Sequence, residues 1–189
     1  MKAAMKLRSK KVYLRHPEAD DCDRLIELYR SSRRHFHGLA RSNFDRESFD
    51  QMLADAAKDS NEFFIVCRVD DATIVGTVNL SQIFRKAFQN AYLGYQLFAG
   101  YTGHGYMSEA VSLALQYAFT DIGLHRIEAN VQPTNKPSIR VLERNGFAKE
   151  GFSRRYLKIG GRWRDHERWA ILKEDWIANK ENGRNRRTN

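Results

Sequence analysis

The chain has 189 residues, of which 42% are hydrophobic and 29% are charged. This length suits one globular domain with its own core and is too short for two large domains. The longest apolar runs, such as residues 63–67, fall far short of the roughly 18 residues that a membrane-spanning helix requires. The amino end is basic but has no apolar stretch behind it, so it does not look like a secretory signal. The composition therefore indicates a cytoplasmic protein that does not enter the membrane.

The net charge of +9 lies mainly at the two ends of the chain. Residues 1–11 and 178–189 together carry eight of the nine units, which leaves the middle of the chain nearly neutral. The ends are either solvated tails that aid solubility or segments that attract the ribosome, RNA or another acidic partner. We therefore expect a basic arm over 1–10, a single domain over 11–177 and a basic, disordered tail over 178–189.

The two cysteines predict neither a cross-link nor a metal site. Cys22 and Cys67 are far apart in the sequence, no Cys-x-x-Cys occurs, and no histidine spacing completes a zinc motif. Cys67 belongs to an apolar run and is predicted to be a buried small hydrophobic residue. We expect the protein to bind no metal.

Apolar residues alternate with a period of two, or recur at helical spacing, in clearly separated segments. The period of two predicts strands over 11–16, 62–69, 74–80, 91–98, 126–131, 147–159 and 162–172. Helical spacing predicts helices over 17–33, 46–58, 105–120 and 136–145, with a last helical turn over 173–179. The three strands between 62 and 98 form an antiparallel meander. The last two strands form a hairpin closed by Gly160 and Gly161.

A glycine-rich loop connects the strand over 91–98 to the long helix that follows it. Gly103 and Gly105 allow the backbone to approach a ligand closely. The backbone N–H groups near the start of the helix are free to bind an anion. They are those of Thr102, Gly103, His104, Gly105, Tyr106 and Met107. The loop lacks the Gly-Lys-Ser/Thr of a Walker motif and the third glycine of a dinucleotide motif. It predicts a phosphate-binding cradle, with a plain tight turn as the alternative.

Several motifs follow one another in a characteristic order. They are Gly100-Tyr101-Thr102-Gly103-His104-Gly105, Leu124-His125-Arg126-Ile127, Asn135-Lys136-Pro137-Ser138-Ile139 and Asn145-Gly146-Phe147. Together with the order of strands and helices, residues 11–176 resemble the GNAT superfamily of acetyl-CoA-dependent N-acetyltransferases. The motifs look like its RimJ/RimL branch, the ribosomal-protein alanine and serine N-acetyltransferases. Gly100 departs from the family signature, which has glutamine or arginine at that position.

The resemblance implies a mixed α/β fold of the GNAT type, in the α+β class. Such a fold has a central, mostly antiparallel twisted sheet of about seven strands with helices on both faces. In this family the fourth and fifth strands, which are parallel neighbours, splay apart and leave a cleft for the cofactor. Here those strands are 91–98 and 126–131. The resemblance therefore implies that coenzyme A lies in this cleft, with its pyrophosphate on the glycine loop.

The resemblance also assigns roles in acetyl transfer from acetyl-CoA to a primary amine. A backbone N–H of Leu97 or Phe98 is expected to polarise the thioester carbonyl. Asn135 is expected to bind the pantetheine arm or the sulfur side of the cofactor. Ser138 lies one helical turn later and resembles the serine proposed in this branch to protonate the thiolate. The alternative for Ser138 is an ordinary serine in the first turn of a helix.

The base that takes the amine proton departs from the family pattern. Part of the branch has an acidic residue where this chain has Arg155, and arginine cannot accept a proton. Glu128, beside the predicted cleft, is the substitute; alternatively it faces solvent or pairs with Arg126 or Arg140. An α-amine titrates near 7.7–8.0 and a lysine near 10.4, so an α-amine can arrive neutral without a base. This difference favours α-amines as acceptors.

The acceptor side is assigned to a loop and to a late strand. His35-Phe36-His37 falls where family members place a substrate-facing loop, although a surface loop with one anchoring Phe is the alternative. Tyr156 is counted with this loop as substrate-binding. Asp165 and His166 resemble a recurring pair of the branch and are interpreted as a strand-end hydrogen bond that supports the fold.

The resemblance leaves the identity of the acceptor open. We expect the N-terminal α-amine of a protein. A small-molecule amine acetyltransferase and a catalytically silent acyl-CoA-binding module are the alternatives, the latter because of Gly100 and Arg155. A nucleic-acid-binding module is disfavoured, because the middle of the chain shows no basic face. The sequence predicts no oligomeric state.

Overall fold

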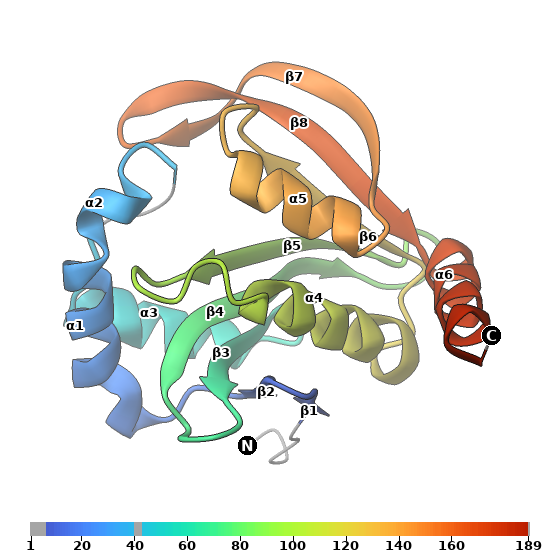
Figure 1. The fold of residues 1–189 in the computed structure, drawn as a ribbon. Helices are drawn as coiled ribbons and strands as arrows, with labels where there is room; N and C mark the ends of the chain where they lie inside the picture. The colour runs from blue at the N-terminus through green and yellow to red at the C-terminus, as the bar shows by residue number, and fades with distance from the viewer. Residues whose placement is uncertain (1–6, 40–42, 189) are drawn as a thin grey trace.

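The described residues form one eight-stranded sheet in the order β1-β2-β3-β4-β5-β6-β8-β7 (Figure 1). The computed structural model describes residues 7–39 and 43–188, and their side chains up to residue 182. The strands are β1 (Leu7–Arg8), β2 (Val12–Arg15), β3 (Glu62–Arg68), β4 (Ile74–Phe84), β5 (Asn90–Leu97), β6 (Arg126–Val131), β7 (Ala148–Ile159) and β8 (Arg162–Leu172). Neighbouring strands are antiparallel except β5 and β6, which are parallel.

Helices cover both faces of this sheet. They are η1 (Ala19–Asp21), α1 (Cys22–Ser31), α2 (Arg33–Phe36), α3 (Arg46–Ala56), α4 (Tyr106–Gln116), the π-helical turn η2 (Tyr117–Asp121), α5 (Lys136–Arg144) and α6 (Lys173–Thr188). α4 contacts β2, β4, β5 and α5, whereas α3 contacts β3 and α1 (Figure 1). No helix in the described part of the chain is long and apolar enough to span a bilayer.

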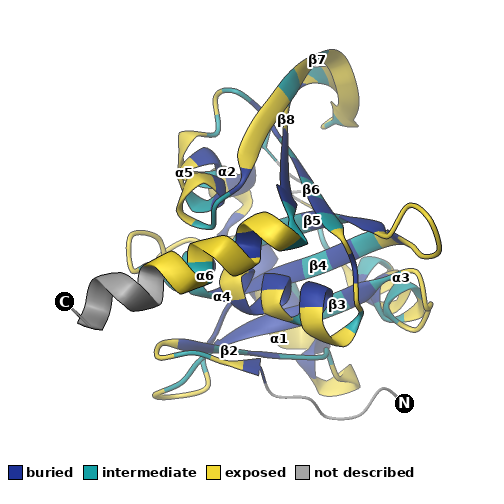
Figure 2. Cartoon of the chain, turned by 90° about the vertical axis from the view of Figure 1, so that its right-hand side faces the viewer, coloured by how far each residue is buried: buried dark blue, intermediate teal, exposed yellow. Residues whose placement is uncertain are grey.

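β3 shows how the two faces are buried. Phe64 and Val66 belong to the core that contains α4 and α5, whereas Ile65 and Cys67 belong to a second core beneath α1 and α3. Because successive side chains of a strand point to opposite faces, a strand covered on both sides appears as a continuous apolar run. Figure 2 shows β3 and β4 largely buried between the helices. Cys67 is buried and free, in agreement with the prediction.

β5 and β6 pair only at their beginnings, where residues 90–92 lie opposite residues 126–128. β5 then stays paired with β4 as far as Leu97, and β6 stays paired with β8 as far as Val131. The two parallel strands therefore separate beyond Tyr92 and open a gap within the sheet, as the resemblance implied.

The amino end differs from the predicted basic arm. Leu7 and Arg8 form β1, because Leu7 lies opposite Leu14 and is only 9% exposed within the core. This short strand raises the predicted seven strands to eight. Residues 1–6 of the predicted arm lie outside the described residues.

The carboxyl end differs from the predicted disordered tail over 178–189. The chain is helical from Lys173 to Thr188, where only a turn over 173–179 was expected. Trp176 is buried against Phe119 and anchors the first turns. Figure 2 shows that much of α6 is exposed.

Candidate active site

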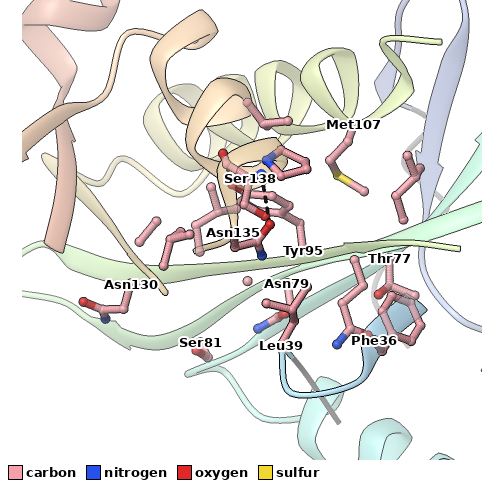
Figure 3. A pocket seen from close by; sticks show the side chains of 18 of the residues that line it. Phe36, Leu39, Thr77, Asn79, Ser81, Tyr95, Met107, Asn130, Asn135 and Ser138 are labelled. Atoms are coloured by element: carbon pink, nitrogen blue, oxygen red, sulfur yellow. Dashed lines mark hydrogen bonds between the residues drawn. The ribbon is translucent and has the colours of Figure 1, made fainter. Parts of the chain in front are cut away.

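A cavity of about 1210 Å³ follows the gap between β5 and β6 and reaches both faces of the sheet. On one face it is lined by the glycine loop, the start of α4 and α5. On the other face it is lined by residues of α1, α2 and α3, of β4, and of the β7–β8 hairpin. Figure 3 shows Ser138 and Asn135 on one side of the sheet and Asn79, Ser81 and Leu39 on the other. We call these two parts the donor half and the acceptor half.

The glycine loop borders the donor half. Gly103 and Gly105 have φ of +84° and +80°, values that L side chains rarely adopt. A Cβ added to Gly103 would meet nothing within 4 Å, so the backbone there is open to a ligand. Within the described part of the chain, no group accepts a hydrogen bond from the N–H groups of residues 102–108. The loop therefore offers free donors at the positive end of α4, which suits a pyrophosphate.

The predicted cradle residues divide into two groups. Thr102, Gly103, Gly105, Tyr106 and Met107 line the cavity, and Ser108 joins them. His104 does not line the cavity, and its carbonyl oxygen accepts a hydrogen bond from Lys11 Nζ at 2.9 Å.

The strand before the loop presents one of the two predicted carbonyl-polarising donors. Phe98 N–H donates to Val75 O at 2.9 Å, so it faces β4 and is occupied. Because alternate residues of a strand direct their N–H groups to opposite neighbours, Leu97 N–H faces away from β4 and toward the gap. Leu97 also lines the cavity, whereas Phe98 is fully buried outside it. The geometry favours Leu97.

Ser138 is held in place from two sides. Asn135 is the N-cap of α5, and its Oδ1 accepts a hydrogen bond from Ser138 N–H at 3.3 Å. The hydroxyl of Tyr95 donates to Ser138 O at 3.0 Å (Figure 3). Ser138 lines the cavity, and its hydroxyl lies against the phenol of Tyr95, with which it interacts. The Nδ2 of Asn135 is a further donor on the same helix.

Tyr95 was missed by the sequence reasoning. Burial raises the pKa of its phenol well above the usual value, so Tyr95 stays protonated and acts as a donor. Its position in a period-two strand that leads into the glycine loop was the available signal. The contact with α5 depends on a partner 43 residues away, which periodicity does not reveal.

The acceptor half has an apolar wall and an uncharged polar floor. The wall includes Phe36, Leu39, Phe44 and Met52, and the floor includes Thr77, Asn79, Ser81, Gln96 and Asn130. Gly94 makes room for this floor, because a Cβ there would stand 2.5 Å from Asn79 Oδ1. Tyr29 donates to Gln96 Oε1 at 2.7 Å and holds that amide in place.

Of the four residues predicted to bind the acceptor, two line the cavity and two do not. His35 and Phe36 line the cavity, and Phe36 is buried against Tyr29 and Phe98. His37 and Tyr156 are not among the lining residues. Tyr156 is instead partly exposed, with its ring 6.1 Å from that of His166.

Glu128 forms an ion pair with Arg126. Its Oε1 accepts a hydrogen bond from Arg126 Nε at 2.9 Å, and the same arginine pairs with Glu150. Glu128 does not line the cavity. This arrangement matches the alternative in which Glu128 is a structural partner of Arg126. Arg155 lies in an irregular part of β7 with φ of +48°, where its N–H donates to Asp165 Oδ1 at 2.7 Å.

His166 combines burial with access to the cavity. It is 2% exposed and lines the acceptor half. Its Nδ1 lies 2.9 Å from Arg164 O, a hydrogen bond that requires the proton on Nδ1 and leaves Nε2 as an acceptor. Burial lowers the pKa of His166, against the opposing effect of Asp165, so the ring is neutral near pH 7. The two residues of the predicted Asp165–His166 pair hydrogen-bond different partners, since His166 bonds Arg164 O and Asp165 accepts from Arg155 N–H. The place of His166 at the cavity was not foreseen.

Comparison with known proteins shows which family this chain resembles in sequence. The family model described as an acetyltransferase (GNAT) domain matches residues 11–148. A probable N-acetyltransferase of Bacillus subtilis, YjcK, is 38% identical over 177 residues, which cover 89% of this chain and 98% of that protein. The [ribosomal protein uS5]-alanine N-acetyltransferase of Escherichia coli is 42% identical over 111 residues, 59% of this chain and 57% of that enzyme.

A solved structure shares the whole architecture. The ribosomal-protein-S5-alanine acetyltransferase of Vibrio fischeri superposes with a TM-score of 0.81 at 29% identity, over 91% of this chain and 98% of that one.

We predict that Gly103→Val weakens acetyl-CoA binding by about tenfold or more, since each lost hydrogen bond to a charged group costs about 1.5–3 kcal/mol. The added side chain would fill the open space at the loop. Gly161→Val is the matched control, because Gly161 also has a positive φ and open surroundings but lies in the β7–β8 turn. Calorimetric titration of both variants measures the difference. Equal affinity of the two variants would contradict a backbone cradle at Gly103.

Proposed function

This chain belongs to the GNAT acetyltransferase family, and we propose that it acetylates the N-terminal α-amine of a protein. It is an N-acetyltransferase that uses acetyl-CoA. The observation that carries the choice of acceptor is the acceptor half of the cavity, which has apolar walls over an uncharged polar floor. The enzymes named for uS5 alanine, to which the chain is similar, support the same choice.

The charges around the acceptor half favour a peptide over a polyamine. Among the described lining residues, the carboxylates are Asp55 and Glu62. Asp55 pairs with Lys58 at 2.6 Å, and Glu62 lies 4.0 Å from His16 Nδ1. A polyamine carries several positive charges and requires several carboxylates to replace its hydration. A peptide N-terminus offers one amine and a neutral backbone, which hydroxyl and amide groups of the floor can hydrogen-bond.

The donor half has groups suited to the pyrophosphate, the pantetheine arm and the thioester of acetyl-CoA. Acetyl-CoA supplies the acetyl group as a thioester, and its transfer to an amine releases the thiol of coenzyme A. The free amides of residues 102–108 would hold the pyrophosphate, and Asn135 would hold the pantetheine arm. Leu97 N–H would polarise the thioester carbonyl from its place in the gap.

Two side chains are proposed to move protons. Ser138, which lines the cavity beside the phenol of Tyr95, donates a proton to the departing thiolate. His166 accepts the proton of the amine at Nε2. We choose His166 over the predicted Glu128 because His166 lines the cavity, whereas Glu128 is hydrogen-bonded to Arg126 outside it. An α-amine needs only a weak base, since its pKa of about 7.7–8.0 leaves part of it neutral.

The acceptor is tested by offering the full chain acetyl-CoA with a panel of amines. The panel holds peptides that begin with alanine or serine, the same peptides with a blocked N-terminus and a free lysine, and spermidine. Thiol release and the product mass should show acetylation of the free N-terminal peptides alone. Preferred turnover of spermidine or of the blocked peptides would overturn the proposal.

For Ser138, we expect Ser138→Ala to lower kcat by about 10²- to 10⁴-fold, the usual contribution of a general acid. The affinity for acetyl-CoA should stay the same, because the hydroxyl acts on the leaving thiolate rather than in binding. Ser138→Thr keeps a hydroxyl and should retain much of the activity. If kcat of Ser138→Ala equals that of the parent enzyme, Ser138 is an ordinary residue of the helix start.

For His166, we expect His166→Gln to lower kcat by about 10²-fold or more and Glu128→Gln to leave it unchanged. The parent enzyme should lose activity as the pH falls through the lowered pKa of His166, below the ordinary 6.5, because protonation occupies Nε2. A pH–rate profile measures this loss, and in His166→Gln only the loss that follows protonation of the acceptor amine, with its pKa of about 7.7–8.0, should remain. The opposite pattern, with Glu128→Gln inactive and His166→Gln active, would restore Glu128 as the base.

A further inference from the structure

One basic residue contacts the glycine loop from outside the cavity. Lys11 precedes β2, and its Nζ donates to His104 O at 2.9 Å. The same Nζ lies 3.6 Å from the place where a Cβ on Gly105 would stand. The backbone N–H of Lys11 donates to Glu109 Oε2 in the first turn of α4, at 2.9 Å. Lys11 is therefore attached to both the loop and the helix that follows it.

The hydrogen bond to His104 determines which way a loop amide points. The C=O of His104 and the N–H of Gly105 belong to one peptide unit, and in a trans peptide they point in opposite directions. No cis peptide bond occurs in the described chain. His104 lies outside the cavity lining and Gly105 lies within it. With the carbonyl held toward Lys11, the N–H of Gly105 is directed to the cavity side.

The loop needs such a restraint because its glycines permit another arrangement. Rotation of the peptide between His104 and Gly105 changes ψ of His104 and φ of Gly105. Glycine adopts positive and negative φ almost equally well, so Gly105 itself does not resist this rotation. A rotated peptide would present a carbonyl oxygen to the pyrophosphate instead of an N–H. That oxygen would repel the anion.

We propose that Lys11 is a positioning residue for acetyl-CoA, which fixes the peptide between His104 and Gly105 with its N–H toward the pyrophosphate. The proposal deepens the proposed function and rests on it for the identity of the anion. It also gives the last residue of the basic amino end a role in donor binding. From the sequence alone, this end was expected to be either a solvated tail or a segment that attracts an acidic partner.

Three variants separate this role from simple charge attraction. Lys11→Met removes the charge and the hydrogen bond, and Lys11→Arg keeps both. Lys10→Met is the matched control, because Lys10 is an exposed neighbour that makes no hydrogen bond or ion pair with the described residues. Lys11 is also exposed, so its side chain contributes little to the core. Thermal unfolding checks that each variant remains folded, and Lys11→Gln replaces Lys11→Met if the latter does not.

Three ligands show which part of the cofactor depends on Lys11. Acetyl-CoA and dephospho-CoA both contain the pyrophosphate, whereas S-acetylpantetheine does not. We expect Lys11→Met to weaken binding of the first two by about tenfold, as loss of one charged hydrogen bond predicts, and to leave S-acetylpantetheine unaffected. Lys11→Arg should restore binding, and Lys10→Met should bind like the parent. In turnover, Lys11→Met should raise KM for acetyl-CoA and leave kcat at saturating donor unchanged.

The outcomes distinguish this proposal from the proposed function. If the parent enzyme binds acetyl-CoA and Lys11→Met binds it equally well, Lys11 has no positioning role. Equal losses in Lys10→Met and Lys11→Met that vanish at high salt would show long-range attraction and would also overturn the proposal. A parent enzyme that binds acetyl-CoA but acetylates no N-terminal peptide would refute the acceptor alone. The binding comparison would still stand.

Discussion

The separation of β5 from β6 is the constraint on which the rest of the site depends. Two neighbouring strands that part inside a sheet leave backbone N–H and C=O groups without their ladder partners. Beyond Tyr92, the inner edge of β5 has no strand beside it, and Leu97 N–H is one of the donors left there. A ligand with an extended polar arm can replace the missing strand. The same gap lets the cavity pass from one face of the sheet to the other, so that a donor and an acceptor can meet within it.

Residues around the gap connect the segments that border it. Tyr95 extends from β5 to the backbone of α5, and Asn135 caps the same helix. At the end of β6, Gln132 donates its side-chain amide to Gly38 O at 2.8 Å, which ties the segment after α2 to the sheet. Each contact joins segments that are distant in the sequence. The gap is therefore a product of the complete fold, because no single strand or loop produces it.

Local patterns predicted the elements well. The period of two located the strands, and Gly103 and Gly105 located the loop that borders the cavity, because both signals depend on neighbouring residues. Long-range contacts explain what was missed. The direction of the Phe98 N–H depends on pairing register, and one residue of shift reverses it. The approach of His166 to the cavity depends on how β8 lies beside β6, which its own sequence does not encode. Leu7 belongs to the sheet through its pairing with Leu14, a contact that the sequence around Leu7 does not reveal.

The two cores on opposite faces of the sheet have a consequence for how such an enzyme can change. β3 contributes Ile65 and Cys67 to one core and Phe64 and Val66 to the other, so each face packs with its own set of side chains. The helices over the acceptor face come from one contiguous stretch of chain, residues 22–56, whereas the glycine loop and α5 follow much later. Natural variation or exchange of that single stretch can thus alter the apolar wall of the acceptor half while the glycine loop and α5 stay unchanged.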